Sequence, residues 1–171
     1  WRENLFKHKD DHFILLNVNR NQQRKDIPKS IMAFKEFKKE VPDSLLYLHC
    51  AIRDQGWYLD EVIKPFGFTM SDVVFPQNFT PGAGLPLNVV NGIYNASDIT
   101  MSTTVGEGWG LSSVESMATK GCCVFPDNTS LSEIFADGRG VLVKSGDTPS
   151  NFNVIPYDNE IIRPTVNVED M

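Results

Sequence analysis

The chain has 171 residues, of which 41% are hydrophobic and 22% are charged, and its net charge is −6 at pH 7. This length suffices for one domain with a substantial apolar core. No apolar run approaches the roughly 20 residues that span a bilayer. The acidic balance argues against general nucleic-acid binding, which requires a basic face.

The cysteines and the first residue bear on where the chain comes from. Cys50, Cys122 and Cys123 lie in or at the end of apolar runs, so we expect buried thiols rather than disulfides. This fits a reducing compartment and predicts a cytoplasmic location. Because the chain begins with Trp1 rather than Met, we expect it to be a piece of a longer protein. Any membrane association of that parent would reside outside this sequence.

The first half of the chain predicts strands that alternate with helices. Residues 13–18 form a short continuous apolar run, typical of a strand covered on both faces. A helix follows over residues 27–40, with Asp26 placed to cap its start and Pro28 in its first turn. The next predicted elements are a strand over 45–50, a short helix over 58–65 and a strand over 73–75.

The same alternation continues in the second half. After a loop rich in Pro and Gly, the pattern predicts a helix over 86–95, a strand over 99–102, a helix over 111–119 and strands over 122–125 and 141–143. A capping box from Ser130 to Glu133 should start a short helix that ends near Gly138. After Lys144 the pattern fades, so we expect a core over 13–145 and an irregular tail over 146–171.

This order of elements predicts a fold and places its ligand site. Alternating strands and helices indicate one α/β domain with a Rossmann-like, doubly wound parallel sheet and right-handed crossovers. Ligands of such sheets bind at the carboxyl ends of the strands. Two segments follow such ends: residues 19–25 and the glycine-rich turn 106–110.

The glycine-rich turn carries the most informative chemistry. A strand that turns through glycines into a helix directs backbone N–H groups at a ligand, which suits a phosphate. Glu107 and Glu115 would repel a phosphate but suit sugar and ribose hydroxyls. In a continuous helix they would lie about 12 Å apart, from ~1.5 Å rise per residue. That exceeds the ~5–9.5 Å of paired glycosidase carboxylates, so the spacing favours a nucleotide-sugar site over hydrolysis.

The basic segment after the first strand complements this turn. Arg20 could hold a diphosphate through its fork of donors, and Lys25 could do so as a point charge. We expect Arg24 to point to solvent. A solvated basic loop is the alternative for this segment, and a solvated helix residue is the alternative for Glu115.

Five motifs in order resemble a known family. Tyr94–Asp98 resembles Y-x-x-A-D, Glu107–Leu111 resembles E-G-F-G-L with Trp109 at the Phe position, Glu115–Ala118 resembles E-A-M-A, Leu131–Ile134 resembles x-x-E-I, and Asn19-Arg20 with Lys25 resembles G-R-x-x-x-x-K with Asn19 replacing Gly. On these motifs the chain resembles the C-terminal donor-binding domain of retaining GT-B glycosyltransferases of family four (glycosyl transferases group 1). The resemblance covers roughly residues 13 to 145.

The resemblance implies roles for individual residues. Arg20, Lys25 and Glu107 would be catalytic, the two cations by stabilising the leaving nucleoside diphosphate and Glu107 by contacting hydroxyls of the donor hexose. Glu115 would bind the ribose. The other implied donor-binding residues are Asn19, Gly108, Trp109, Gly110, Leu111 and Ser112, with Phe75, Pro76 and Gln77 near the base.

Substrates, metals and cofactors follow from the same resemblance. The donor would be a UDP- or GDP-sugar, and the acceptor a glycan or lipid bound through an N-terminal domain. These families generally need no metal, and the sequence has no Asp-x-Asp triplet. His8, His12 and His49 show no metal-ligand spacing and are interpreted as surface or strand-end residues. We therefore expect neither a metal nor a cofactor.

The acceptor domain of a GT-B enzyme has no counterpart in this sequence. We therefore expect the chain alone to bind the donor without transferring sugar, and we hypothesise that the tail folds only against that domain. Two alternatives stay open: a GT-B nucleotide-sugar epimerase, and a non-catalytic α/β module for protein interaction. Nucleotide binding that depends on Arg20 and Glu115 would separate the last from the first.

Overall fold

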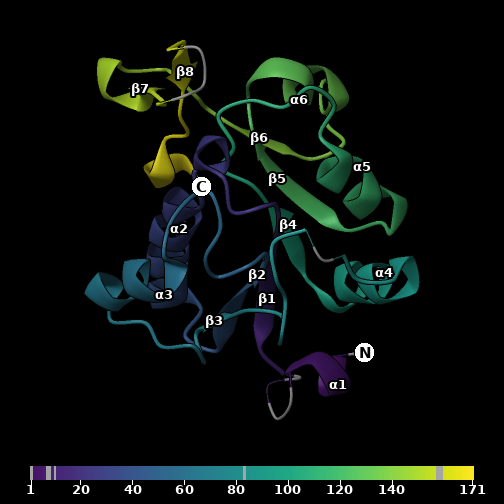
Figure 1. Cartoon of the computed structure of the whole chain (residues 1–171). Coiled ribbons are helices and arrows are strands. Elements are labelled where there is room, and N and C mark those ends of the chain that lie inside the picture. Colours follow the sequence, from purple (N-terminus) through teal and green to yellow (C-terminus); the bar gives the residue numbers. More distant parts are fainter. Residues whose placement is uncertain (1, 7–8, 10, 83, 157–159) are drawn as a thin grey trace.

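The computed structural model describes residues 2–6, 9, 11–82, 84–156 and 160–171, and a six-stranded sheet forms its centre (Figure 1). The strands of the sheet are β1 (Phe13–Val18), β2 (Ser44–His49), β3 (Val73–Val74), β4 (Ile99–Met101), β5 (Cys122–Pro126) and β6 (Val141–Val143). Their order is β3-β2-β1-β4-β5-β6, and each neighbouring pair is parallel. The predicted doubly wound α/β fold is thereby confirmed.

Helices cover both faces of the sheet. They are α1 (Arg2–Phe6), α2 (Ile27–Glu40), α3 (Leu59–Val62), α4 (Leu87–Ala96), α5 (Leu111–Ala118) and α6 (Thr129–Ile134), with 3-10 turns η1 (Gln23–Lys25) and η2 (Lys64–Phe66). Figure 1 shows α2 and α3 on one side of the sheet and α4 and α5 on the other. The predicted helices agree with these to within a few residues, and α1 is an additional helix.

Two apolar layers form most of the core. Because successive residues of a strand point to opposite faces, Leu15 joins the layer under α2 while Ile14 and Leu16 join the layer under α4. Phe34 of α2 and Ile93 of α4 are fully or almost fully buried in these layers. The continuous apolar run of β1 thus reflects burial on both sides, as its pattern predicts.

Both predicted helix caps are wrong in detail. Asp26 precedes α2, but its backbone is left-handed (φ 45°) and its side chain makes no capping hydrogen bond. Side-chain caps normally need an extended residue at this position. Ser130 lies inside α6, which begins at Thr129, and its hydroxyl donates to the carbonyl oxygen of Glu107 (3.0 Å). Its capping group is therefore used to hold a neighbouring loop.

The cysteine prediction holds for two of the three residues. Cys50 and Cys123 are free and buried, whereas Cys122 is free but exposed. Cys122 is the first residue of β5, where the strand emerges from the turn after α5. The alternation of a strand therefore turns Cys123 inward and leaves Cys122 outside.

The tail contains regular structure that the sequence pattern does not indicate. It forms η3 (Pro149–Asn151), an antiparallel pair of β7 (Phe152–Val154) and β8 (Ile162–Pro164), and η4 (Val168–Asp170). Lys29 of α2 donates through Nζ to Thr165 Oγ1 (2.7 Å) and to the carbonyl of Val166 (2.8 Å). Val168 and Met171 pack against the apolar layer of α2. The tail lies along this domain because α2 offers it both donors and apolar contact.

Candidate functional site

The order of the sheet creates a place for a ligand. From β1 the chain runs outward to β2 and β3, then returns to β4 on the other side of β1, so the loops after β1 and β4 diverge. Doubly wound sheets bind ligands in the crevice at such a switch point. A cavity of about 700 Å³ lies there, lined by residues that follow β1, β2 and β4 and by part of the loop before α4.

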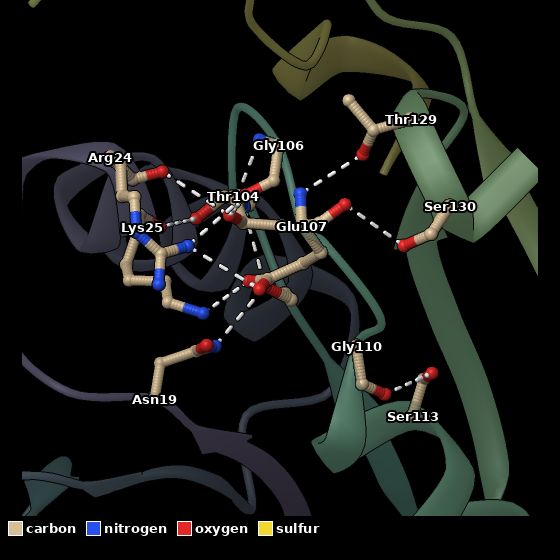
Figure 2. A network of polar contacts seen from close by, with 12 residues as sticks. Asn19, Arg24, Lys25, Thr104, Gly106, Glu107, Gly110, Ser113, Thr129 and Ser130 are labelled. Carbon is tan, nitrogen blue, oxygen red and sulfur yellow. Dashed lines mark hydrogen bonds and ion pairs between the residues drawn. The ribbon is translucent and has the colours of Figure 1, made fainter. Parts of the chain in front are cut away.

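Glu107 is the centre of a charged cluster that borders this cavity. One carboxylate oxygen, Oε1, pairs with Lys25 Nζ, and the other, Oε2, accepts from Arg24 Nη1 (3.3 Å). Arg24 Nη1 also donates to the carbonyl of Gly106 (3.1 Å), as Figure 2 shows. Arg24 was expected to point to solvent, and 41% of its side chain is exposed, but it also pairs with Glu107, which was not predicted. The carboxylate and the carbonyl after β4 draw its guanidinium across to the glycine turn.

Backbone contacts fix the position of Glu107 from both sides. Its N–H donates to Thr129 Oγ1 (2.9 Å), and its carbonyl accepts from Ser130 Oγ at the start of α6 (Figure 2). The N–H of Val105 donates to the carbonyl of Arg24 (2.9 Å), which joins the loop after β4 to the loop after β1. Glu107 is thus held through its side chain by the segment after β1 and through its backbone by the start of α6.

Lys25 is a cation largely removed from water, with only 10% of its side chain exposed. Burial lowers the pKa of Lys25, and the contact with Glu107 opposes that shift. A buried ammonium needs such a partner to remain charged. The prediction that Lys25 faces the site is consistent with its position on the cavity wall.

Asn19 takes the place of the glycine of the resembled motif and also lines the cavity. Its Nδ2 donates to Asn17 Oδ1 (2.6 Å) and to Ser102 Oγ (3.1 Å). Since Ser102 follows β4, the amide ties the carboxyl ends of β1 and β4 together. Its hydrogen bonds within the protein give this asparagine a structural role at the floor of the site.

Arg20 lines the cavity with about half of its side chain exposed. Its Nε donates to Asp54 Oδ2 (2.7 Å) and its Nη2 to Asp54 Oδ1 (3.2 Å). These bonds hold the pKa of Asp54 below its usual range. Sequence reasoning missed Asp54, although an acidic residue soon after the second strand is the signal that could have found it.

The loop that carries Asp54 is anchored by the fully buried Asn21. Asn21 Nδ2 donates to the carbonyl of Trp57 (2.8 Å), and its Oδ1 accepts from the N–H of the same residue (3.0 Å). Gly56 lies so close that a Cβ there would be 2.3 Å from Asn21 Oδ1. This two-way bond fixes the loop after β2 against the loop after β1.

The start of α5 presents its backbone to the same cavity. Gly110 precedes the helix with φ +79°, and its carbonyl accepts from Ser113 Oγ (2.7 Å; Figure 2). Trp109, Gly110, Leu111 and Ser112 all line the cavity, and Trp109 exposes 63% of its surface. Gly108 borders a smaller neighbouring cavity instead.

Glu115 lies one turn further along α5 and is exposed on the cavity wall. Its Oε2 accepts from the hydroxyl of Tyr94 (2.8 Å), a residue of α4. Burial, together with this contact, raises the pKa of Tyr94. The tyrosine therefore stays a donor and orients the carboxylate, which rules out a purely solvated side chain for Glu115.

The three residues predicted near a base lie elsewhere. Phe75, Pro76 and Gln77 line a separate cavity of about 410 Å³, which also borders α1, and Phe75 is mostly buried in the core. The structure does not bring them together with the charged cluster. Phe79, from the same loop, lines the main cavity. The centroid of its ring lies 5.2 Å from the centroid of the His49 ring.

The histidines fall in different environments. His49 ends β2 and is 8% exposed on the cavity wall, whereas His12 is half-buried before β1. His8 lies outside the described residues. In the part of the chain that the structure describes, no group of three His, Cys, Asp or Glu side chains could hold a metal ion.

Fold and cavity together define a doubly wound α/β domain with a polar cavity at its switch point. Its fold is that of the C-terminal domain of GT-B glycosyltransferases of group 1. The C-terminal domain of the group 1 glycosyl transferase LpcC from Francisella tularensis is 23% identical with a TM-score of 0.64, and the match covers 84% of this chain and 74% of that one.

Two longer enzymes share the same fold. WaaG, a glycosyltransferase involved in lipopolysaccharide biosynthesis, is 19% identical over 84% of this chain and 36% of its own, with a TM-score of 0.65. The trehalose 6-phosphate synthase of Burkholderia multivorans is 14% identical over 82% and 34%, with a TM-score of 0.66. The chain thus spans about a third of these two enzymes. No family model and no curated protein matches it.

None of the described helices combines the length and the apolar character needed to cross a bilayer.

Proposed function

We propose that this domain binds the nucleoside-diphosphate-sugar donor of a retaining glycosyltransferase that transfers a hexose to a glycan or lipid acceptor. The observation that carries the proposal is the cavity at the ends of β1 and β4. One wall supplies cations, one supplies the backbone at the start of α5, and two glutamates flank them. Each part suits a different portion of a UDP- or GDP-sugar.

The diphosphate would lie between Arg20, Lys25 and the start of α5. Free N–H groups and the helix dipole favour an anion at that end of a helix. Arg20 uses its Nε and Nη2 on Asp54, which leaves its Nη1 group for a phosphate. As the bond to the sugar breaks, these cations would stabilise the charge on the leaving diphosphate, in the role that a metal fills in other enzymes.

The glutamates would bind hydroxyl groups. The carboxylate of Glu107 has several acceptor positions, so it can accept from sugar hydroxyls while it stays paired with Lys25 and Arg24. Glu115 accepts from Tyr94 and has capacity for both hydroxyls of a ribose. The carboxylates of the site would thereby select a glycosylated nucleotide over a simple phosphate.

Calorimetric titration with UDP and GDP tests the proposal. We expect saturable binding of at least one of them, weakened about tenfold or more in Arg20→Gln, since charged hydrogen bonds contribute about 1.5–3 kcal/mol. Glu115→Gln should weaken the binding of a nucleoside diphosphate but leave the binding of inorganic pyrophosphate unchanged, because only the nucleotide carries a ribose.

Matched controls separate the site from general charge effects. Arg139→Gln and Glu36→Gln remove the same charges at exposed ion pairs outside the cavity, and both should bind like the unaltered protein. If neither UDP nor GDP binds, the donor-site proposal fails and a non-catalytic interaction module becomes the better account.

A further inference from the structure

One wall of the main cavity is not used by the charged cluster. It is formed by His49 at the end of β2, the small residues after it, and Phe79 with Pro81 from the loop before α4. The one acidic residue there, Asp54, is already paired with Arg20. Apart from this ion pair and the imidazole, the wall is apolar and aromatic.

The imidazole of His49 has two unlike nitrogens. Its Nδ1 is fully enclosed and has no hydrogen-bond partner among the residues that the structure describes. The residue is 8% exposed and lines the cavity, and since Nδ1 is enclosed, Nε2 is the ring nitrogen left to face the cavity. Burial lowers the pKa of His49, which keeps the ring neutral at pH 7.

A neutral imidazole has a proton on only one of its two nitrogens. The enclosure of Nδ1 determines which nitrogen that is. A proton on Nδ1 would be a buried N–H donor without an acceptor, which folded proteins avoid more strictly than an unsatisfied acceptor. The proton therefore belongs on Nε2. His49 presents one N–H donor to the cavity and no charge.

Phe79 influences which kind of ligand group can accept the hydrogen bond from His49. Its ring meets that of His49 at an interplanar angle of 60°, with the ring centroids 5.2 Å apart, and both residues line the cavity. Flat, weakly polar heteroaromatic rings suit such a corner, whereas a charged phosphate is better matched by the cations across the cavity.

We propose that His49 is a specificity-determining residue that selects nucleobases with a keto oxygen at C4 of a pyrimidine or C6 of a purine, by donating its Nε2–H to that oxygen beside the ring of Phe79. The inference rests on the proposed donor site and narrows its ligand. Uracil and guanine present such an oxygen. At the corresponding ring carbon, cytosine and adenine carry an amino group. This group is itself a hydrogen-bond donor, so it cannot accept from the Nε2–H of His49.

Paired ligands that differ at this position provide the test. We expect UDP to bind about tenfold or more tightly than CDP, or GDP than ADP, because the mismatched base leaves buried donors unpaired. The His49→Phe variant keeps an aromatic ring but lacks the N–H, so it should bind both members of a pair alike. Its matched control, His12→Phe, lies outside the cavity and should retain the preference.

Nitrogen-15 NMR of the unaltered protein gives a readout that does not depend on any variant folding. We expect the His49 proton on Nε2 in the free protein, and a shift of Nε2 but not Nδ1 on addition of the keto nucleotide. A proton found on Nδ1 overturns the inference even if nucleotides bind.

The binding outcomes distinguish the two proposals. If nucleotides bind without a keto preference, or if the preference survives in His49→Phe, the inference fails and the donor site stands. If inorganic pyrophosphate binds as tightly as every nucleotide, the inference fails and only a diphosphate site remains. If neither nucleotides nor pyrophosphate bind, the donor site fails and the inference with it.

Discussion

Glu107 places one negative charge between two cations in a poorly solvated position. Its side chain is 13% exposed and that of Lys25 is 10% exposed. Burying such charges is costly, so the pair is poor evidence of net stabilisation, whereas removal of one partner leaves the other uncompensated. The electrostatics of this cluster therefore serve the site more than the fold.

Glu107→Gln should destabilise the protein by about 2–4 kcal/mol, because Lys25 would lose its counter-charge in a buried place. Urea-induced unfolding measures this. The exposed pair of Glu36 with Lys39 supplies the control, and Glu36→Gln should change stability by about 0.5 kcal/mol or less. A double variant with Lys25→Met should recover part of the loss, and a double variant worse than Glu107→Gln would contradict this account.

Asp26 makes the stability of the folded protein depend on pH. Burial raises the pKa of its carboxyl from 3.8 to about 6, with Lys29 opposing the shift. Between these two values the folded state binds more protons than the unfolded state, so this group makes stability fall as pH rises. The left-handed backbone of Asp26 suits asparagine equally well.

Asp26→Asn should therefore be neutral near pH 4 and stabilise the protein by about 1–2 kcal/mol at pH 7. The difference in unfolding free energy between the variant and the unaltered protein should grow between about pH 4 and pH 6. Urea unfolding at a series of pH values checks this. If this difference in unfolding free energy stayed constant across that range, the pKa of the Asp26 carboxyl would not be raised.

At the scale of elements, the start of α5 depends on one glycine. Gly110 has φ +79°, and a Cβ there would lie 2.9 Å from Leu131 Cδ2 and 3.2 Å from Ser113 Oγ. A side chain would strain the backbone and push α5 away from α6. The start of α5, which lines the cavity, is thus positioned by its contacts with α6 and Ser113.

Gly110→Ala should cost about 1–3 kcal/mol of stability, since strain and crowding act together. It should also weaken nucleotide binding. Gly108→Ala is the matched control, because a Cβ at Gly108 meets nothing within 4 Å. Thermal unfolding and calorimetric titration report the two effects. Equal stability of the two variants would contradict the proposed crowding.

The sequence predicts elements better than their ends. The apolar run of β1 and the periodicity of α2 depend on burial, which leaves a pattern in the chain. Ser130 and Asp26 were expected to cap helices, but Ser130 binds the carbonyl of Glu107 and Asp26 is left-handed. These contacts depend on partners that are distant in the sequence, so no local sequence pattern predicts them.

At the scale of the molecule, the site is assembled by the reversal of strand order between β1 and β4. The sequence places Arg20, Lys25 and Glu107 at strand ends, and the structure puts all three on one cavity. It does not indicate Arg24, Asp54 or His49, because their roles depend on which loops meet across the sheet. Phe75 to Gln77 line a separate cavity beside α1, a helix that the pattern does not predict.

Backbone amide NMR during titration with UDP and GDP tests the central claim most directly. We expect saturable shifts concentrated in residues 19–25 and 107–115, with little change in β3, α1 or the tail. Shifts concentrated at the cavity of Phe75 and Pro76, or no saturable shift with either nucleotide, would contradict a donor site at the ends of β1 and β4.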